Sequence, residues 1–494
     1  MGRGDDLLLD LRQPCRPSQG TAFQECCSES PGLPAFRLPQ LFGSRSRRGV
    51  NGRAVVLRTS FVALAFHLRT DQLLVAPEAQ VAKKGAVARM NPRGIYVYVT
   101  PFFPSPKNWR GGFSLDAVKA LARCGWRVEV FVGRSKKNES GDYVYDGVTV
   151  HQFVRQTTPC ELAPFLVERR NVHSFLRSFD EVGLKAADVA VCHVHTVFFA
   201  AYAQALKCRN PGLVAALQHH FSPPFHLCAG RLGELPGHAT LLYRHWRRRC
   251  GEMDVQVFTS ERSRSLYACD ARGVDLRRHL LFGRWMRPFA SHEDYVLYNG
   301  FDPTVFKPGN TAKPVGVKPV IGCVANFFPG KGQLNLLKAV ALLADRGRSV
   351  KVRLVGSGKT RDVCERFARE HRLDVEFLDE MPHAALPEFY RSLDLYVLPS
   401  TYAEGFNCTC AEAHGSGIPV LGFAGTSLDE AIIRERDRWL APSGDINRLA
   451  DLMARALRNR HFQTWDIALD IDHVMADWTR WVESRTNQME VVLP

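Results

Sequence analysis

The sequence predicts an α/β protein made of two doubly wound, Rossmann-like domains in series. From about residue 93 onwards, short apolar runs rich in β-branched and aromatic residues alternate with segments of helical periodicity. This alternation stops near residue 300 and then begins again. No run of about 18 apolar residues occurs, so a membrane-spanning helix is not expected. With 494 residues, 45% of them hydrophobic, the chain is long enough for two separate cores.

Residues 1–91 show no sustained periodicity and are rich in Arg, Ser, Gly and Pro. We predict a disordered or poorly ordered extension, with a short helix over residues 77–84. A wrongly assigned start codon would give a segment of the same appearance. No basic stretch precedes an apolar run near residue 1, so a signal peptide is not expected.

The first domain is assigned to residues 92–297 and begins with a β-α-β unit. We predict a strand over Ile95–Thr100, a helix over Ser114–Arg123 and a second strand over Arg127–Val132. Two more buried strands are expected over Val189–Val197 and Leu213–Phe221, and both contain histidine. A further strand-to-helix change follows in "DVQVFTSERSRSLY". This order is typical of a parallel, doubly wound sheet.

The second domain is assigned to residues 298–465, after the turn dipeptides Asn299-Gly300 and Asp302-Pro303. Its expected strands are "PVIGCVANF", "VKVRLVGSG", "DVEFLD" and "DLYVLPS", separated by three helical segments. Residues 466–494 form an amphipathic helical segment that we expect to pack back on the first domain. Small ligands are expected in the cleft between the carboxyl ends of the two sets of strands.

The net charge of +15, from 65 basic and 50 acidic residues, favours anionic partners. Two segments, Arg244–Cys250 and Leu276–Arg287, mix Arg with aromatic residues or Leu. They are either a solvated surface or a patch that faces anionic lipid or a charged acceptor. No recognisable nucleic-acid module is present, so we expect no nucleic-acid partner. The fourteen cysteines lack zinc spacing and indicate free thiols in the cytoplasm, with peripheral membrane contact left open.

The segment "NFFPGKG", Asn326–Gly332, lies between a predicted strand and a predicted helix. Gly330 and Gly332 permit close backbone approach, and Lys331 places a positive charge beside the start of the helix. A phosphate group requires these features. The alternative is a simple turn with an exposed lysine.

The segment "TYAEGFNCTCAEAHGSGIPV" contains two glutamates, Glu404 and Glu412. In one continuous helix they would be about 80° apart around the axis and roughly 12 Å apart along it, so they are not a contacting acid–base pair. Gly405 and Asn407 instead predict a loop, with the helix starting near Cys408 or Thr409. Glu404 would then lie in the cleft and Glu412 one turn deeper.

A second interpretation of Glu412 remains open. Thr409-x-x-Glu412 fits a capping box, in which the glutamate would accept a hydrogen bond from the Thr409 amide.

These segments together resemble the retaining GT-B glycosyltransferases of the glycosyltransferase 4 (group 1) family. "EGFNCTCAE" followed by "GIPVLGF" resembles the E-x7-E signature. The linker, the donor block, the second glycine loop and the N-terminal glycine loop have their counterparts in "YNGFDPTVFKP", "IGCVANFFPGKGQLNLLKA", "LVGSGK" and "PFFPSPKNWRGG". The resemblance covers about residues 93–465.

The resemblance implies the GT-B fold, with an acceptor domain and a donor domain facing across a cleft. It implies transfer of a hexose from a nucleotide-diphosphate sugar, with UDP- and GDP-sugars favoured, to a hydroxyl of a glycan or lipid-linked glycan. The anomeric configuration would be retained. Neither a cofactor nor a metal is implied, and the sequence has no DxD motif in a suitable loop.

The resemblance also implies roles for individual residues. Lys331 would bind the donor diphosphate, Glu404 the hydroxyls of the donor sugar and Glu412 the ribose. Phosphate and sugar would be held in the second-domain loop by Gly405 and Thr409 and by the backbone amides of Phe406, Asn407 and Cys408. In the first domain, Gly111 and Gly112 would let the glycine loop approach the diphosphate.

A histidine after a strand of the first domain would face the reacting sugar. His219 and His220 both qualify, and we prefer His219 from its spacing to Pro211. His193 and His195 resemble the wall of a pocket. The predicted catalytic residues are therefore His219, Glu404 and Lys331.

One position departs from the family pattern. Asn326 stands where the family usually has an arginine, so this position of the donor site cannot supply a cation. Either Lys331 and the helix dipole suffice, or another arginine reaches the diphosphate. The alternative to transfer is a catalytically degenerate GT-B scaffold that binds a nucleotide-sugar or glycan.

Overall fold

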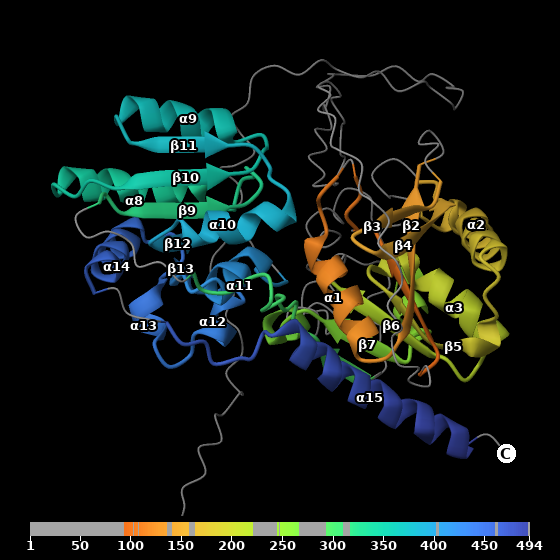
Figure 1. Cartoon of the computed structure of the whole chain (residues 1–494). Coiled ribbons are helices and arrows are strands. Elements are labelled where there is room, and N and C mark those ends of the chain that lie inside the picture. The colour runs from red at the N-terminus through yellow and green to blue at the C-terminus, as the bar shows by residue number, and fades with distance from the viewer. Residues whose placement is uncertain are drawn as a thin grey trace, which may run out of the picture. The chain divides into compact units, whose positions relative to one another are not determined.

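The structure, a computed structural model, describes residues 93–492 except 102, 107, 136–140, 158–163, 221–244, 247, 266–292, 310–316, 402–404 and 460–462. The predicted extension 1–91, including the short helix at 77–84, lies outside the described residues. Two parallel sheets with helices packed on them make up the described chain (Figure 1). The predicted fold class is confirmed.

The first sheet has eight strands in the order β3-β4-β2-β1-β5-β6-β7-β8. The strands are β1 (Ile95–Thr100), β2 (Arg127–Arg134), β3 (Tyr143–Tyr145), β4 (Val148–Val154), β5 (Val189–Val194), β6 (Val214–His219), β7 (Val255–Phe258) and β8 (Glu293–Val296). Among the described strands of this sheet, only β3 and β4 pair antiparallel. The strand order reverses beside β1, between β2 and β5, and this is where doubly wound sheets bind ligands.

Helices cover both faces of this sheet, and β1 is therefore buried along its whole length. The helices are α1 (Gly112–Arg123), α2 (Glu168–Glu181) and α3 (Ala200–Arg209), with short 3-10 turns at η3 (Pro164–Leu166), η4 (Ala186–Asp188) and η5 (Val197–Phe199). Phe131, Phe153 and Phe175 belong to the core on the α2 and α3 side. Leu115 and Val118 of α1 belong to the core on the other side.

The second sheet has six parallel strands in the order β11-β10-β9-β12-β13-β14. The strands are β9 (Val320–Val324), β10 (Lys351–Val355), β11 (Val375–Leu378), β12 (Leu395–Leu398), β13 (Val420–Phe423) and β14 (Leu440–Ala441). The helical elements are α8 (Gln333–Asp345), α9 (Arg361–Glu370), η7 (His383–Ala385), α10 (Leu386–Arg391), α11 (Cys408–Gly415), α12 (Leu428–Ala431), α13 (Arg436–Trp439) and α14 (Ile446–Asn459). This strand order, with the reversal at β9, is that of dinucleotide-binding sheets.

The chain then returns to the first sheet through α15 (Ile471–Val492), which runs beside α1 in Figure 1. Ile471, Met475, Trp478 and Val482 are part of the core that contains β1 and α1. Trp478 is fully buried. The sequence boundaries at residues 92, 298 and 466 stay a prediction, but the core of the first sheet includes residues from the end of the chain.

Most predicted elements occur at their expected places, and the differences lie at their ends. Strand Ile95–Thr100 is observed with the same limits, and the helix predicted from Ser114 begins at Gly112. The strand predicted over Leu213–Phe221 ends at His219. As a result, His219 is the last residue of β6, while His220 is the first residue beyond it. Within the described residues, no helix is both long and apolar enough to cross a membrane.

Candidate functional site

The loop between β9 and α8 holds Lys331 at the carboxyl edge of the second sheet. The carbonyl of Gly330 accepts hydrogen bonds from the Thr401 amide at 2.8 Å and from the Ser400 hydroxyl at 3.0 Å. Gly332 precedes α8 with a φ of 86°, and a β-carbon there would lie 2.0 Å from the carbonyl oxygen of Pro399. The loop is therefore fixed against the end of β12, with the half-buried Lys331 beside the first turn of α8.

Asn326 opens the same loop and is exposed. Its carbonyl accepts a hydrogen bond from Gln333 of α8 at 3.0 Å. The backbone of Asn326 thus helps to hold the loop, whereas its side chain brings no charge.

The loop before α11 places Gly405 against the first sheet. A β-carbon on Gly405 would lie 2.6 Å from the carbonyl oxygen of His220 and 2.6 Å from the hydroxyl of Thr259. Only glycine fits between these atoms. The loop predicted to hold phosphate and sugar therefore lies directly against the carboxyl ends of β6 and β7. Glu404, the preceding residue, lies outside the described residues.

Asn407 immediately precedes α11 and is 4% exposed. Within the described part of the chain, neither polar atom of its carboxamide has a hydrogen-bond partner. Such a buried amide costs free energy unless a ligand or water satisfies it. Phe406 packs on Tyr298, and the Cys408 sulfur lies 3.5 Å from the Asn299 amide nitrogen.

Thr409 lies within α11, and its hydroxyl is 2.8 Å from the hydroxyl of Tyr396 in β12. Glu412 is buried and accepts a hydrogen bond from the Tyr390 hydroxyl at 2.8 Å. The helix begins at Cys408, with no side-chain hydrogen bond at its cap. The capping box is therefore wrong, because Asn407 and not Thr409 is the cap residue of this helix. Thr409 and Glu412 instead hydrogen-bond Tyr396 and Tyr390.

The start of α1 contacts the second sheet through a buried group of ionisable residues. Gly111 has a φ of 97°, and a β-carbon on Gly112 would lie 2.6 Å from the ring of His383. The Nε2 atom of His383 lies 3.8 Å from a carboxylate oxygen of Asp116 and 3.5 Å from one of Glu412. The predicted N-terminal glycine loop and the predicted ribose ligand are thus brought together by His383, which sequence analysis did not identify.

The surroundings shift the pKa values of this group. Burial raises the pKa of Asp116 to about 7, against the opposing effect of His383. Burial alone would lower the pKa of His383, but hydrogen bonding to Glu412 and the negative charges of Glu412 and Asp116 raise it above 6.5. Asp116 therefore titrates near neutral pH, and His383 holds its proton more tightly than a free imidazole does.

This titration leads to a stability prediction for Asp116→Asn. A folded-state pKa near 7 in place of 3.8 means that the native protein binds this proton more tightly than the unfolded chain does. The stability contributed by this carboxyl is present at low pH and is lost as the pH rises through about 7. Relative to wild type, the variant should therefore gain free energy of unfolding between about pH 5 and about pH 8. Urea unfolding at both pH values measures this difference, and a difference independent of pH contradicts the prediction.

The two candidate histidines have different surroundings. The His219 Nε2–H group donates to the Gln256 side-chain oxygen at 2.8 Å, and its ring stacks on Phe258. Burial lowers the pKa of His219 to about 4. His220 is half-buried, its Nε2 lies 2.8 Å from Nδ1 of His195, and its carbonyl contacts Gly405. His219 is thus held within the sheet, whereas His220 adjoins the second-domain loop.

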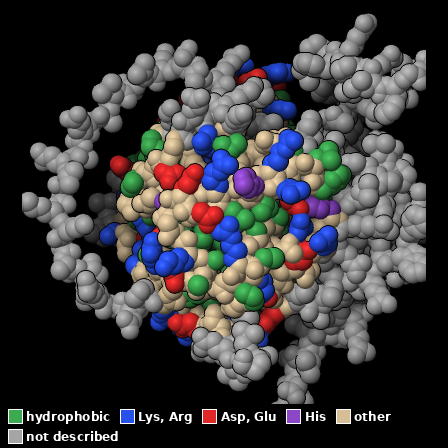
Figure 2. Space-filling view, turned by 90° about the vertical axis from the view of Figure 1, so that its right-hand side faces the viewer, with side chains coloured by type: hydrophobic (Ala, Val, Ile, Leu, Met, Phe, Trp, Pro, Cys, Tyr) green, Lys and Arg blue, Asp and Glu red, His purple; other side chains and the backbone are tan. Residues whose placement is uncertain are grey.

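The basic segment at residues 244–250 is partly paired with acidic residues. Arg249 forms ion pairs with Glu168 and Glu252, and Arg248 pairs with Glu252. On the face drawn in Figure 2, basic and acidic side chains are interspersed. Segment 276–287 lies outside the described residues. Among the described residues, no group of three or more His, Cys, Asp or Glu side chains is arranged to hold a metal ion.

Comparison with known proteins agrees with this architecture. The profile of the family described as "Glycosyl transferases group 1" matches residues 311–465. A protein of Corynebacterium glutamicum is 24% identical over 212 residues, which are 40% of this chain and 55% of that protein. Its name is GDP-mannose-dependent monoacylated alpha-(1-6)-phosphatidylinositol monomannoside mannosyltransferase. A D-inositol 3-phosphate glycosyltransferase of Nocardia farcinica is 34% identical over 152 residues, 28% of this chain and 34% of that protein. The chain spans about half the length of the curated relatives it matches.

Solved structures match a larger part of the chain. Sucrose-phosphate synthase from Thermosynechococcus elongatus superposes with a TM-score of 0.56 at 18% identity, over 81% of this chain and 98% of the other. A structure described as trehalose-6-phosphate from E. coli bound with UDP-2-fluoro glucose gives 0.53 at 14% identity, over 80% and 98%. The paired sheets are therefore a GT-B fold. Residues 311–465 are similar to the group 1 family of glycosyl transferases, and this similarity agrees with the fold.

Proposed function

We propose that this protein is a retaining glycosyltransferase that moves a hexose from a nucleotide-diphosphate sugar to an acceptor hydroxyl. The observation that carries the proposal is the junction of the two family loops at one edge of the second sheet. The Thr401 amide, at the start of the second loop, donates to Gly330 in the first at 2.8 Å. Lys331 and the start of α11 thus lie on segments that are bonded to each other.

Catalysis at the carboxyl edge of the second sheet would consist of stabilising a departing nucleoside diphosphate. In the proposed site, Lys331 and the amides of Phe406, Asn407 and Cys408 neutralise the charge that develops on its phosphates. Preorganised groups of this kind are usually the largest single contribution to such catalysis. Glu404 binds the sugar hydroxyls, and the acceptor hydroxyl attacks from the face that the diphosphate leaves. The departing phosphate takes its proton.

Some predicted contacts are refined by their surroundings. The carboxamide of Asn407 adds a buried, unsatisfied polar group to the loop, whereas the Thr409 hydroxyl faces Tyr396. Because the Asn407 carboxamide lacks a partner among the described residues and the Thr409 hydroxyl has one, we favour the Asn407 side chain as a ligand for phosphate or sugar. We propose that Glu412 reaches the ribose while Tyr390 holds its other oxygen. His220, beside Gly405, replaces His219 as the proposed histidine of the reacting face.

A nucleotide-release assay tests the proposed activity. The full chain is incubated with UDP-, GDP- and ADP-sugars, and slow release of nucleotide is measured. We expect one donor class to be turned over, and Glu404→Gln to lower the rate by about 10²-fold because a contact to the donor sugar is lost. The control is Glu370→Gln, which changes an exposed carboxylate at the end of α9.

Three outcomes separate the alternatives. Turnover that depends on Glu404 supports the transferase. Donor binding without nucleotide release supports the degenerate scaffold. The uncharged Asn326, at a position where the family usually has an arginine, would agree with that outcome. No binding of any donor, with Glu404→Gln behaving as wild type, excludes the enzymatic proposal.

The acceptor class is part of the same proposal. Relatives named for phosphatidylinositol monomannoside transfer support a lipid-linked glycan acceptor at the cytoplasmic face of an anionic membrane. In the assay, the acceptor is therefore offered both in vesicles with anionic lipid and as a soluble glycan. Faster turnover with the vesicle-borne acceptor is expected, and equal rates argue against a membrane acceptor.

A further inference from the structure

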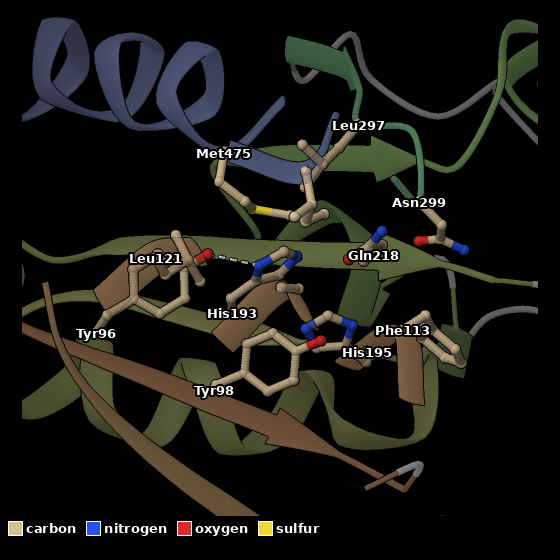
Figure 3. A pocket seen from close by; sticks show the side chains of 12 residues that line it. Tyr96, Tyr98, Phe113, Leu121, His193, His195, Gln218, Leu297, Asn299 and Met475 are labelled. Carbon is tan, nitrogen blue, oxygen red and sulfur yellow. Dashed lines mark hydrogen bonds between the residues drawn. The ribbon is translucent and has the colours of Figure 1, made fainter. Parts of the chain in front are cut away.

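A series of buried aromatic and imidazole rings connects α15 with the end of β6. Trp478 of α15 contacts Tyr96 of β1, which contacts His193 of β5. His195, two residues further along the chain, contacts His220. Figure 3 shows Tyr96, His193 and His195 beside one small pocket. The series ends at the residue that adjoins the Gly405 loop.

The first part of the series determines where one proton lies. The indole nitrogen of Trp478 can only donate, and it lies 2.9 Å from the Tyr96 hydroxyl oxygen. The single hydroxyl proton of Tyr96 is then available for Nδ1 of His193, 2.6 Å away. His193 accepts at Nδ1, and its own proton therefore lies on Nε2.

In the second part of the series, no direct hydrogen bond joins His193 to His195, and both residues face the pocket. The rings of His193 and His195 have centroids 4.3 Å apart, and their side chains are 1% and 2% exposed. Neither Nε2 atom has a hydrogen-bond partner among the described residues. Both residues line the pocket together with Gln218 and Asn299. Its enclosed space is about the size of one water molecule and is too small for a sugar ring.

We propose that a water bridges the Nε2 atoms of His193 and His195 and that Tyr96 and His193, through this water, fix the proton positions of His195 and His220. The His193 Nε2–H group donates to the water, and the water donates to Nε2 of His195. The His195 Nδ1–H group then donates to Nε2 of His220, 2.8 Å away, which leaves the proton of His220 on Nδ1.

The packing of the rings supports a fixed arrangement of neutral imidazoles. The ring centroids of Tyr98 and His195 are 4.0 Å apart, and those of Phe113 and His220 are 5.3 Å apart. These aromatic neighbours limit rotation of the two imidazole rings. Burial lowers the pKa of His193 and of His220 to about 3 in each case. Tyr96, Trp478 and His193 are thus positioning residues, and their effect on transfer rests on the proposed role of His220.

Nitrogen-15 NMR of the histidine rings tests the proton positions without any substrate. The full chain is labelled on its histidine rings, and the three signals are assigned with His193→Gln, His195→Gln and His220→Gln. In wild type we expect the proton on Nε2 of His193 and on Nδ1 of His195 and His220. In Tyr96→Phe all three should shift towards mixed tautomers, because the donor to His193 is lost.

The matched control is Tyr295→Phe. Tyr295 packs on Trp478 with ring centroids 4.9 Å apart, but its hydroxyl lies outside the series. This variant should leave the three tautomers unchanged. If Tyr96→Phe does not fold, Trp478→Phe removes the donor to Tyr96 while an aromatic ring is kept. A proton on Nδ1 of His193 in wild type, or unchanged tautomers in the folded Tyr96 or Trp478 variant, overturns the proposal.

A kinetic measurement separates this proposal from the proposed function. With the donor found in the release assay, Tyr96→Phe should lower kcat about tenfold and leave the donor KM within about twofold, as expected for a loss confined to the transition state. An unchanged kcat overturns the positioning role. If no donor is turned over, the NMR result still decides the proton positions, and only the transferase proposal fails.

Discussion

Replacing Lys331 by alanine is expected to lower kcat/KM for the nucleotide-sugar by about 10²- to 10³-fold, the effect typical of removing one group that stabilises developing charge. The backbone around Lys331 is fixed by the bonds of Gly330 to Ser400 and Thr401. Asn326 provides no charge in this loop, so Lys331 is its cation. Steady-state nucleotide release with the preferred donor measures the effect.

The control for this variant is Lys338→Ala. Lys338 lies in α8, two turns after Lys331, and is exposed. Both variants change the net charge equally, and only Lys331→Ala should slow the reaction. Lys331→Arg should restore part of the rate, since it returns the charge with a different shape. Equal rates for the two alanine variants would remove Lys331 from the proposed mechanism.

Gly332→Ala is expected to cost more than about 3 kcal/mol of folding free energy or to prevent folding. The added β-carbon would lie 2.0 Å from the carbonyl oxygen of Pro399, which is backbone and cannot rotate away. The φ of 86° adds strain for any residue with a side chain. Urea unfolding of wild type and variant gives the difference.

Gly347→Ala separates these two causes. Gly347 follows α8 with a φ of 73°, but apart from its two chain neighbours no described residue has an atom within 4 Å of the position that a β-carbon would take there. This variant should cost only about 1 kcal/mol, from backbone strain alone. A similar loss for both glycines would show that the contact with Pro399 contributes little.

The elements of this fold are readily predicted where burial is continuous. Ile95–Thr100 is covered on both faces and is predicted to the residue, because a run of apolar side chains bounded by a proline loop allows few alternatives. The end of β6 is predicted less well. The apolar run continues into "QHHF", and only the pairing of His219 with Phe258 in β7 shows where the strand stops.

The site is predictable as a set of loops but not as a set of contacts. The positions of Lys331 and Gly405 at strand ends follow from the alternation of strands and helices. The partners of Glu412 do not follow from this alternation. Tyr390 and His383 lie 22 and 29 residues away in the chain, and nothing local indicates that they would displace a capping box. Gln256 likewise holds His219 from another strand.

The return of α15 to the first sheet has a consequence for the order in which the chain can fold during synthesis. Domains usually fold as units as they leave the ribosome, the N-terminal one first. Here Tyr96 and Leu115 of the first domain share their core with Met475 and Trp478. That core remains incomplete until residues 471–482 have been made, after the whole second sheet. The first sheet is therefore finished later than the second, although its strands are synthesised earlier, and its apolar face needs protection from aggregation until then.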